Sequence, residues 1–334
     1  MSEESWRAFS NSKVAGADAP RSVPSIARMS KSGSDPSGYI VPRDLADAVD
    51  VAIALGQPLL LMGEPGTGKT ELAHHIAWKL FGEHAKAIVF NTKTTSTARD
   101  LFYSYDSIRH FRDAQLGKSG EGAAVELRAQ DYINYQGLGL AILLARSDAE
   151  SNRLLPEELR GFPARQSVVL IDEIDKAPRD LPNDILHEIE RMHFHVPETG
   201  KEYSADDSFR PIVILTSNSE RMLPEPFLRR CVFHNLKFPE GEELKTIVLS
   251  RLGLDNARPA STIKWIDGAI AEFNTYRGKM DRKPATAELL SWLRWLQQIQ
   301  SATNSDEPWK HASGAAAKGA LAKTKEDRAK LEGV

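Results

Sequence analysis

A glycine-rich stretch, GEPGTGKT at residues 63–70, carries the residue types that bind phosphate groups. It has the spacing G-x-x-x-x-G-K-[ST], follows the apolar run PLLLM and precedes the helical pattern ELAHHIAWKLF. Glycines let backbone N–H groups turn inward around phosphates, and the following helix adds the positive end of its dipole. Lys69 is expected to reach the β- and γ-phosphates, and the Thr70 hydroxyl to ligate Mg²⁺. The predicted nucleotide-binding residues of this stretch are Gly63, Glu64, Pro65, Gly66, Thr67, Gly68, Lys69, Thr70 and Glu71.

Two carboxylates stand at the end of a second apolar run, VVLIDEIDKAP, about a hundred residues further on. Asp172 is expected to bind nucleotide and to complete a Mg²⁺ shell with Thr70, while Glu173 orients and polarises an attacking water. The guanine-recognition pattern Asn-Lys-x-Asp is missing from the sequence. Hydrolysis of ATP to ADP and phosphate is therefore the leading reaction, with ATP and Mg²⁺ as the predicted ligands.

Three further polar residues follow the acid pair along the chain. The run PIVILTSN ends in Asn218, an amide suited to hold the lytic water from the opposite side. In ERMLPEPFLRRC, Arg229 and Arg230 end a predicted short helix. Paired arginines usually form a solvated face, yet an arginine inserted across a subunit boundary would stabilise charge on the transferring phosphoryl group. The predicted catalytic residues are Glu173, Asn218, Arg230 and Arg229.

The elements that must position these residues are visible as short apolar runs, at residues 58–63, 87–91, 167–173 and 211–218. Continuous Val, Ile and Leu runs between helical patterns predict strands of a parallel sheet that is buried on both faces. After residue 237 the apolar residues recur at three- and four-residue spacing, without a strand-like run. The predicted fold is α/β, a phosphate-loop domain with a parallel sheet flanked by helices, followed by a small α-helical lid domain.

Composition limits the remaining possibilities. The chain has 334 residues, 41% of them hydrophobic, and a formal charge of −3, so it can bury a large core but carries no basic field for indiscriminate nucleic-acid or membrane binding. One cysteine, Cys231, excludes an internal disulfide and suits a reducing compartment, and no run predicts a signal peptide or membrane span. The cytoplasm is the expected location.

The ends of the chain have a different composition. Residues 1–38 are rich in Ser, Ala, Pro and Gly, which predicts a disordered tail, and residues 303–334 are Ala- and Lys-rich, which predicts a flexible or docking tail. Between them we expect an α/β domain at 39–237 and a helical lid at 238–302. Residues 95–140 are expected to form an insertion and residues 191–210 a hairpin.

The sequence resembles AAA+ ATPases in four stretches that occur in this order and are followed by a helical domain: GEPGTGKT, LIDEIDKAP, ILTSN and LPEPFLRRC. The local sequence around the acid pair and the arginines is most similar to the MoxR group. The resemblance covers about residues 38–300. It implies an ATP-hydrolysing ring, a hexamer in most such proteins, in which Arg230 matches the finger that acts on the neighbouring subunit. Arg229 replaces an acidic residue often found there, so the choice between the two arginines stays open.

The resemblance also implies a function and exposes one departure. MoxR-type proteins remodel or activate protein clients, often with a separate von Willebrand factor A domain protein, and their insertions are candidate client-contacting elements. Ala287 stands where the family commonly has the sensor 2 arginine of the lid, and Lys283 or Arg282 is a candidate substitute. The alternatives are a nucleotide-gated assembly scaffold with little turnover, which the alanine favours, and a DNA-associated regulator, which the mixed charge of the insertion disfavours.

Two other clusters of side chains, a histidine pair and a tryptophan pair, are expected to have structural roles. His193 and His195 share a face if they lie on a strand, but no cysteine or HExxH spacing accompanies them, so surface histidines are preferred to a zinc site. Trp292 and Trp295 recur at helical spacing and are expected in the lid core rather than in a nucleic-acid stack.

Overall fold

The computed structural model describes residues 35–118, 127–218, 221–254, 260–303, 305–311 and 319–332. The chain divides into two compact units. We call one the sheet unit, Val41–Gly63 with Lys69–Leu236, and the other the helical unit, Met1–Ile40, Glu64–Gly68 and Lys237–Val334. The predicted tail at 1–38 lies outside the described residues, apart from its last four.

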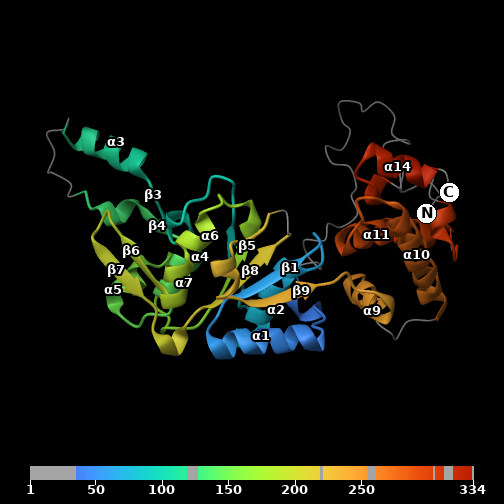
Figure 1. The fold of residues 1–334 in the computed structure, drawn as a ribbon, viewed down its shortest axis with the longest axis horizontal. Coiled ribbons are helices and arrows are strands. Elements are labelled where there is room, and N and C mark those ends of the chain that lie inside the picture. Colours follow the sequence, from blue (N-terminus) through green and yellow to red (C-terminus); the bar gives the residue numbers. More distant parts are fainter. Residues whose placement is uncertain are drawn as a thin grey trace, which may run out of the picture. The chain divides into compact units, whose positions relative to one another are not determined.

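Five parallel strands form the centre of the sheet unit, in the order β2-β5-β8-β1-β9 (Figure 1). Their bounds are β1 Leu59–Gly63, β2 Ile88–Asn91, β5 Val168–Asp172, β8 Ile212–Ser217 and β9 Val232–Leu236. The inner strands β5 and β8 are buried along almost their whole length, as continuous Val, Ile and Leu runs require, whereas the edge strands β2 and β9 are only partly buried. The predicted α/β fold with a parallel sheet is confirmed.

Helices cover both faces of this sheet. Because neighbouring strand residues point to opposite faces, Val169 and Ile171 share one core with the apolar helix α4, while Leu170, between them, faces the other side. Helix α2 packs on β1, β5 and β8, and α1 packs on β1 and β9. The helices of the sheet unit are α1 Arg43–Leu55, α2 Lys69–Phe81, α4 Gly137–Leu144, α5 Ala149–Leu154, α6 Leu181–Asp184, α7 Leu186–Arg191 and α8 Glu225–Leu228.

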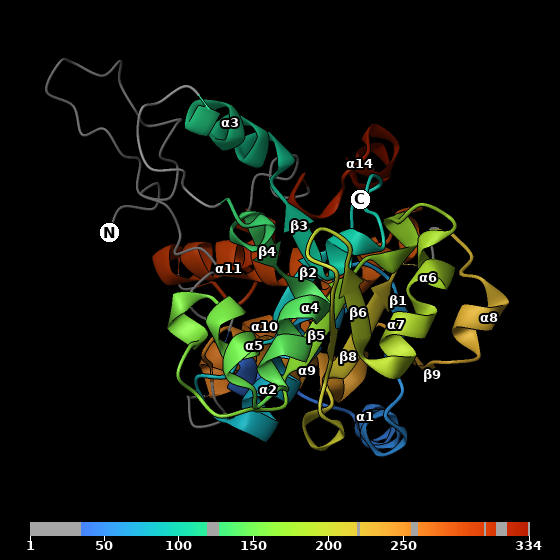
Figure 2. The same ribbon diagram turned by 90° about the vertical axis from the view of Figure 1, so that its left-hand side faces the viewer.

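The predicted insertion and hairpin regions contain two small antiparallel ribbons. One pairs β3 (Tyr103–Tyr105) with β4 (Ile133–Tyr135), and the other pairs β6 (His193–Val196) with β7 (Lys201–Ser204). Their buried aromatic rings contact one another and join the ribbons, as between Tyr103, Phe194 and Tyr203. Helix α3 (Ser107–Lys118) follows β3 and extends away from the sheet in both views (Figures 1 and 2). Its Ile108 and Phe111 side chains are exposed.

The helical unit is held by an apolar core that includes Trp265, Phe273 and Trp292. Leu321 and Leu331, from the Ala- and Lys-rich end of the chain, belong to the same core. The buried Asp327 carboxylate accepts the N–H groups of Asp281 at 2.8 Å and Arg282 at 3.3 Å. Residues 319–332 are thus packed on the other helices of this unit. The helices of the helical unit are α9 Gly241–Arg251, α10 Ala260–Lys279, α11 Thr286–Thr303, α12 Pro308–His311 and α14 Lys325–Glu332.

In the part of the chain that the structure describes, every helix is too short or too polar to cross a membrane.

Candidate functional site

The phosphate-loop stretch links the end of β1 to the start of α2. Gly66 and Gly68 have φ values of 78° and 92°, in the left-handed region that side chains other than glycine enter at a cost. The Thr67 hydroxyl donates a hydrogen bond to the Glu64 carbonyl at 2.9 Å and closes the loop on itself. The 13-residue helix α2 begins directly afterwards at Lys69. This is the strand–loop–helix arrangement that the sequence predicts for phosphate binding.

Lys69 is buried, with 6% of its surface exposed. Its Nζ donates to the carbonyl oxygen of Gly63 at 2.8 Å. Burial lowers the pKa of the Lys69 ammonium, and the nearby carboxylates, Asp172 first among them, oppose that shift. The Lys69 ammonium is therefore buried and hydrogen-bonded to its own loop, where it is positioned to bind an anion that enters the loop.

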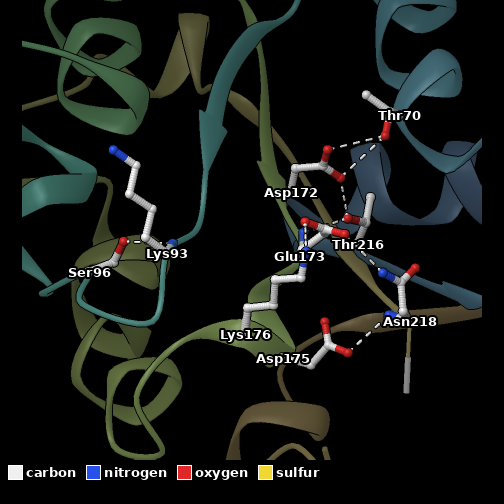
Figure 3. Close-up of polar contacts among 9 residues, drawn as sticks. All are labelled: Thr70, Lys93, Ser96, Asp172, Glu173, Asp175, Lys176, Thr216 and Asn218. Carbon is white, nitrogen blue, oxygen red and sulfur yellow. Dashed lines mark hydrogen bonds and ion pairs between the residues drawn. The ribbon is translucent and has the colours of Figure 1, made fainter. Parts of the chain in front are cut away.

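Two hydroxyl groups from different elements converge on Asp172 at the end of β5 (Figure 3). The Thr70 hydroxyl, from α2, lies 3.2 and 3.3 Å from the two carboxylate oxygens. The Thr216 hydroxyl, from β8, donates to Oδ1 at 2.5 Å and accepts the N–H of Glu173 at 2.8 Å. Thr70 and Asp172 therefore bring a hydroxyl and a carboxylate together, which is an oxygen donor set of the kind that Mg²⁺ prefers.

The Glu173 carboxylate has a donor on each oxygen. Asn218 Nδ2 donates to Oε1 at 3.1 Å, and Lys176 Nζ donates to Oε2 at 2.5 Å (Figure 3). The backbone of Glu173 is left-handed, with φ 56° and ψ 51°. Asn218 is itself held by its N–H, which donates to the buried Asp175 carboxylate at 3.1 Å. The acid that could take a proton from water is thus held at its backbone and at both ends of its carboxylate.

Comparison with protein families matches residues 58–231, just over half of the chain, to the AAA domain of the dynein-related subfamily. The chain belongs to this family. The matched part of the AAA domain spans the phosphate loop, the acid pair, Asn218 and both arginines. The search of curated proteins found no match. The predicted resemblance to AAA+ ATPases is confirmed at the level of the family, whose members generally hydrolyse ATP.

Three residues that support this AAA-domain site were not singled out from the sequence, namely Thr216, Asp175 and Lys176. Thr216 lies on β8 two residues before Asn218, which directly follows the strand. Because side chains two residues apart along a strand point to the same face, the sequence could have indicated that Thr216 and Asn218 lie on one side of the sheet. Asp175 and Lys176 belong to the quoted run LIDEIDKAP, but their contacts depend on the turn made at Glu173. Their types alone carried no signal beyond a charged loop.

Arg229 and Arg230 of the AAA domain are not brought to this cluster. The arginines directly precede β9, whose first residue pairs with Leu59 at the start of β1, whereas the phosphate loop leaves the other end of β1. Arg229 forms an ion pair with Glu225, and Arg230 Nε lies 3.6 Å from a carboxylate oxygen of Glu190. Both side chains are about half exposed or more.

Within the helical unit, a different arginine from those considered in the sequence contacts the phosphate loop. Arg277, on α10, lies with its guanidinium 2.6 Å from the Glu64 carboxylate, 2.5 Å from the Pro284 carbonyl and 3.9 Å from the centre of the Phe238 ring. Its side chain is 13% exposed. A Cβ added at Gly66 would lie 2.9 Å from that of Ala285 and 3.6 Å from that of Ala287. The small residue at 287 therefore packs beside the loop itself.

The two histidines of the predicted hairpin differ in exposure, because His195 is exposed whereas His193 is partly buried. His193 and His195 lie on β6, where His193 Nε2 is 3.5 Å from a carboxylate oxygen of Glu202. Among the described residues, no group of three or more His, Cys, Asp or Glu side chains is arranged to hold a metal ion. Trp292 lies in the helical core, 2% exposed.

Proposed function

We propose that this protein hydrolyses ATP to ADP and phosphate, with Glu173 as the base and Lys69, Thr70, Asp172 and Asn218 as the groups around it. The observation that carries the proposal is the hydrogen-bonded cluster of Thr70, Asp172, Glu173 and Asn218, which lies where β5 and β8 end and α2 begins. The carboxyl ends of parallel strands are the usual place for ligands in such sheets.

The phosphate loop, residues 63–70, would bind the triphosphate. Backbone N–H groups of the loop and the start of α2 supply partial positive charge, and the Lys69 ammonium would exchange its bond to the Gly63 carbonyl for phosphate oxygens. The Thr70 hydroxyl and Asp172 carboxylate fit Mg²⁺ and would hold it. When bound, Mg²⁺ neutralises charge that develops on the β- and γ-phosphates.

Hydrolysis would then proceed by attack of water in line with the leaving group. The water oxygen bonds to the γ-phosphorus, the bond from that phosphorus to the bridging oxygen of ADP breaks, and the water proton passes to Glu173. Asn218 holds the Glu173 carboxylate through Nδ2, so a water between the two side chains would be oriented from both. Positioning of this kind supplies most of the catalysis in phosphoryl transfer.

We also place the site in a ring of MoxR type, a hexamer, that remodels or activates a protein client. In support, Arg230 lies at the far end of β1 from its own phosphate loop and its side chain is about half exposed, so a neighbouring subunit's site is the one it would complete. The exposed Ile108 and Phe111 of α3 offer an apolar surface on the insertion. A von Willebrand factor A domain protein is the proposed partner, and nucleic acid is disfavoured as a substrate.

The first experiment measures phosphate release from ATP by the wild type and by Glu173→Gln, with molecular mass recorded in the same buffer. Turnover should be lost in the variant while ATP binding and ATP-dependent assembly are retained. Unchanged phosphate release in Glu173→Gln would remove that residue from its role. Assembly without phosphate release in the wild type would instead favour the nucleotide-gated scaffold, the alternative to which Ala287 points.

A mixing experiment tests the role of Arg230 between subunits. Arg230→Ala has an intact hydrolysis site but no finger to give, whereas Glu173→Gln has the finger but no base. Each alone should be inactive, and mixed rings should regain activity where an Arg230→Ala site meets a Glu173→Gln neighbour. Arg229→Ala is the companion variant: retained activity would assign the finger to Arg230, whereas the same loss and rescue would assign it to Arg229. Mixtures without activity, at a mass that proves co-assembly, would refute action in trans.

A further inference from the structure

Lys176 makes the shortest contact to the proposed base. It ends the turn η5 (Ile174–Lys176), and its Nζ lies 2.5 Å from Oε2 of Glu173, opposite the oxygen that Asn218 contacts (Figure 3). The peptide N–H of Lys176 also donates to the Glu173 carbonyl at 2.9 Å. Lysine and glutamate are therefore joined at both backbone and side chain.

The rest of the Glu173 residue is fixed before Lys176 acts. Its left-handed backbone and the hydrogen bond from its N–H to Thr216 hold the start of the side chain. The far end of a glutamate retains rotamer freedom unless both carboxylate oxygens are held. One donor on each oxygen defines the carboxylate plane. A carboxylate accepts about four hydrogen bonds, so positions for a water remain.

The charge of the ammonium matters as much as its hydrogen bond. Glu173 lies beside Asp172, and a bound triphosphate would add further negative charge, which tends to push the base away from the γ-phosphate. Lys176 is the cation that opposes this repulsion at Oε2. The side chains of the pair are 38% and 37% exposed, and ion pairs this exposed contribute little to stability. Stability of the fold therefore does not account for the contact.

We propose that Lys176 is a positioning residue for hydrolysis, which keeps the Glu173 carboxylate in its orientation toward the attacking water. The inference rests on the proposed ATPase function. It assigns Lys176 no contact with ATP, so its loss should lower kcat and leave KM and the affinity for ATP unchanged.

The test compares wild type, Lys176→Met, Lys176→Arg and Lys93→Met in steady-state phosphate release and thermal unfolding. Lys93 is the matched control, because it is an exposed lysine after β2 whose side chain points away from the acid cluster (Figure 3). Lys176→Met should lower kcat about tenfold, a part of the roughly 10²–10⁴-fold that a general base supplies. KM and Tm should stay at wild-type values, Lys176→Arg should recover most of the loss, and Lys93→Met should match the wild type.

A second background separates action through Glu173 from any other effect. In Glu173→Gln the lysine has no carboxylate to position, so adding Lys176→Met should not lower the residual phosphate release further. An equal tenfold fall in both backgrounds, or a wild-type kcat in Lys176→Met, would overturn the inference. Failure of the proposed function looks different: the wild type itself would then release no phosphate, and the inference would fall with it.

Discussion

The buried Thr216 hydroxyl is the most direct point at which to test how the site is held together. Its Oγ1 donates to Asp172 at 2.5 Å and accepts the Glu173 N–H at 2.8 Å, and the residue has no exposed surface. Thr216→Val keeps the shape and removes both bonds. Leaving the Glu173 N–H without this acceptor costs about 1–3 kcal/mol, and losing a bond to a charged group costs a similar amount. Together the two losses should destabilise the variant by about 2–6 kcal/mol.

Calorimetric unfolding without nucleotide measures this effect. At about 2–4 °C per kcal/mol for a domain of 150–250 residues, Thr216→Val should lower Tm by about 4–24 °C. Thr216→Ser is the matched control, because it keeps the hydroxyl and loses one methyl group, worth about 1 kcal/mol. The expected order of Tm is therefore wild type, then Ser, then Val. If Ser proves no more stable than Val, packing rather than the hydroxyl holds this position and the reasoning is wrong.

Three further predictions concern other parts of the chain. Arg277→Ala removes the ion pair to Glu64 and should raise the Kd for ATP about fivefold, or about 1 kcal/mol, as measured by isothermal titration calorimetry. Glu64→Gln should raise the Kd by a smaller factor, and an unchanged Kd in both variants would contradict this prediction. Burial raises the pKa of the Cys231 thiol from 9.0 to about 12, so at pH 9 iodoacetamide should label the native protein slowly and the unfolded protein fast. Stability should fall between pH 9 and 12, because the thiol ionises at lower pH in the unfolded state than in the native state. Fast labelling of the native protein would disprove this prediction. Leu331→Ala should lower the free energy of unfolding of the helical unit by about 2–4 kcal/mol, as measured by thermal unfolding. The control Glu326→Ala, at an exposed position, should change that free energy by less than about 0.5 kcal/mol. Equal losses of stability in the two variants would show that the C-terminal segment is not part of the core.

The presence of an unbroken apolar run decides which strands could be predicted from the sequence. β1, β5 and β8 are inner strands covered on both faces, and their unbroken Val, Ile and Leu runs identify them. β9 was not among the four predicted runs. It is an edge strand in which partly buried and exposed residues alternate, as at Phe233, 55% exposed, so its sequence VFHNL lacks a continuous apolar signal.

The same distinction applies to the site. Spacing within the phosphate loop and the acid pair singles out Lys69, Thr70, Asp172 and Glu173, because each has a side-chain type that suits the proposed chemistry. The contact from Lys176 to Glu173 depends instead on a left-handed glutamate, and glutamate has no special preference for that conformation. Sequence patterns could therefore indicate the proposed base but not the lysine that contacts it.

The C-terminal segment shows a third kind of limit. Its apolar residues are few and scattered among Ala and Lys, so composition left a flexible and a docking tail equally open. Leu321 and Leu331 nevertheless reach the helical core, and Asp327 binds two backbone N–H groups there. The packing of this segment depends on a few specific contacts, and amino-acid composition does not show where individual residues lie.

Because the backbone of Glu173 is left-handed, stability and the proposed activity favour different residues at this position. A residue with a side chain gives up about 1–2 kcal/mol to occupy that region, and glycine gives up almost none. Glycine at 173 would therefore relieve the backbone while deleting the proposed base. Variants selected only for heat resistance should drift toward glycine at this position, and selection that also demands turnover should restore glutamate.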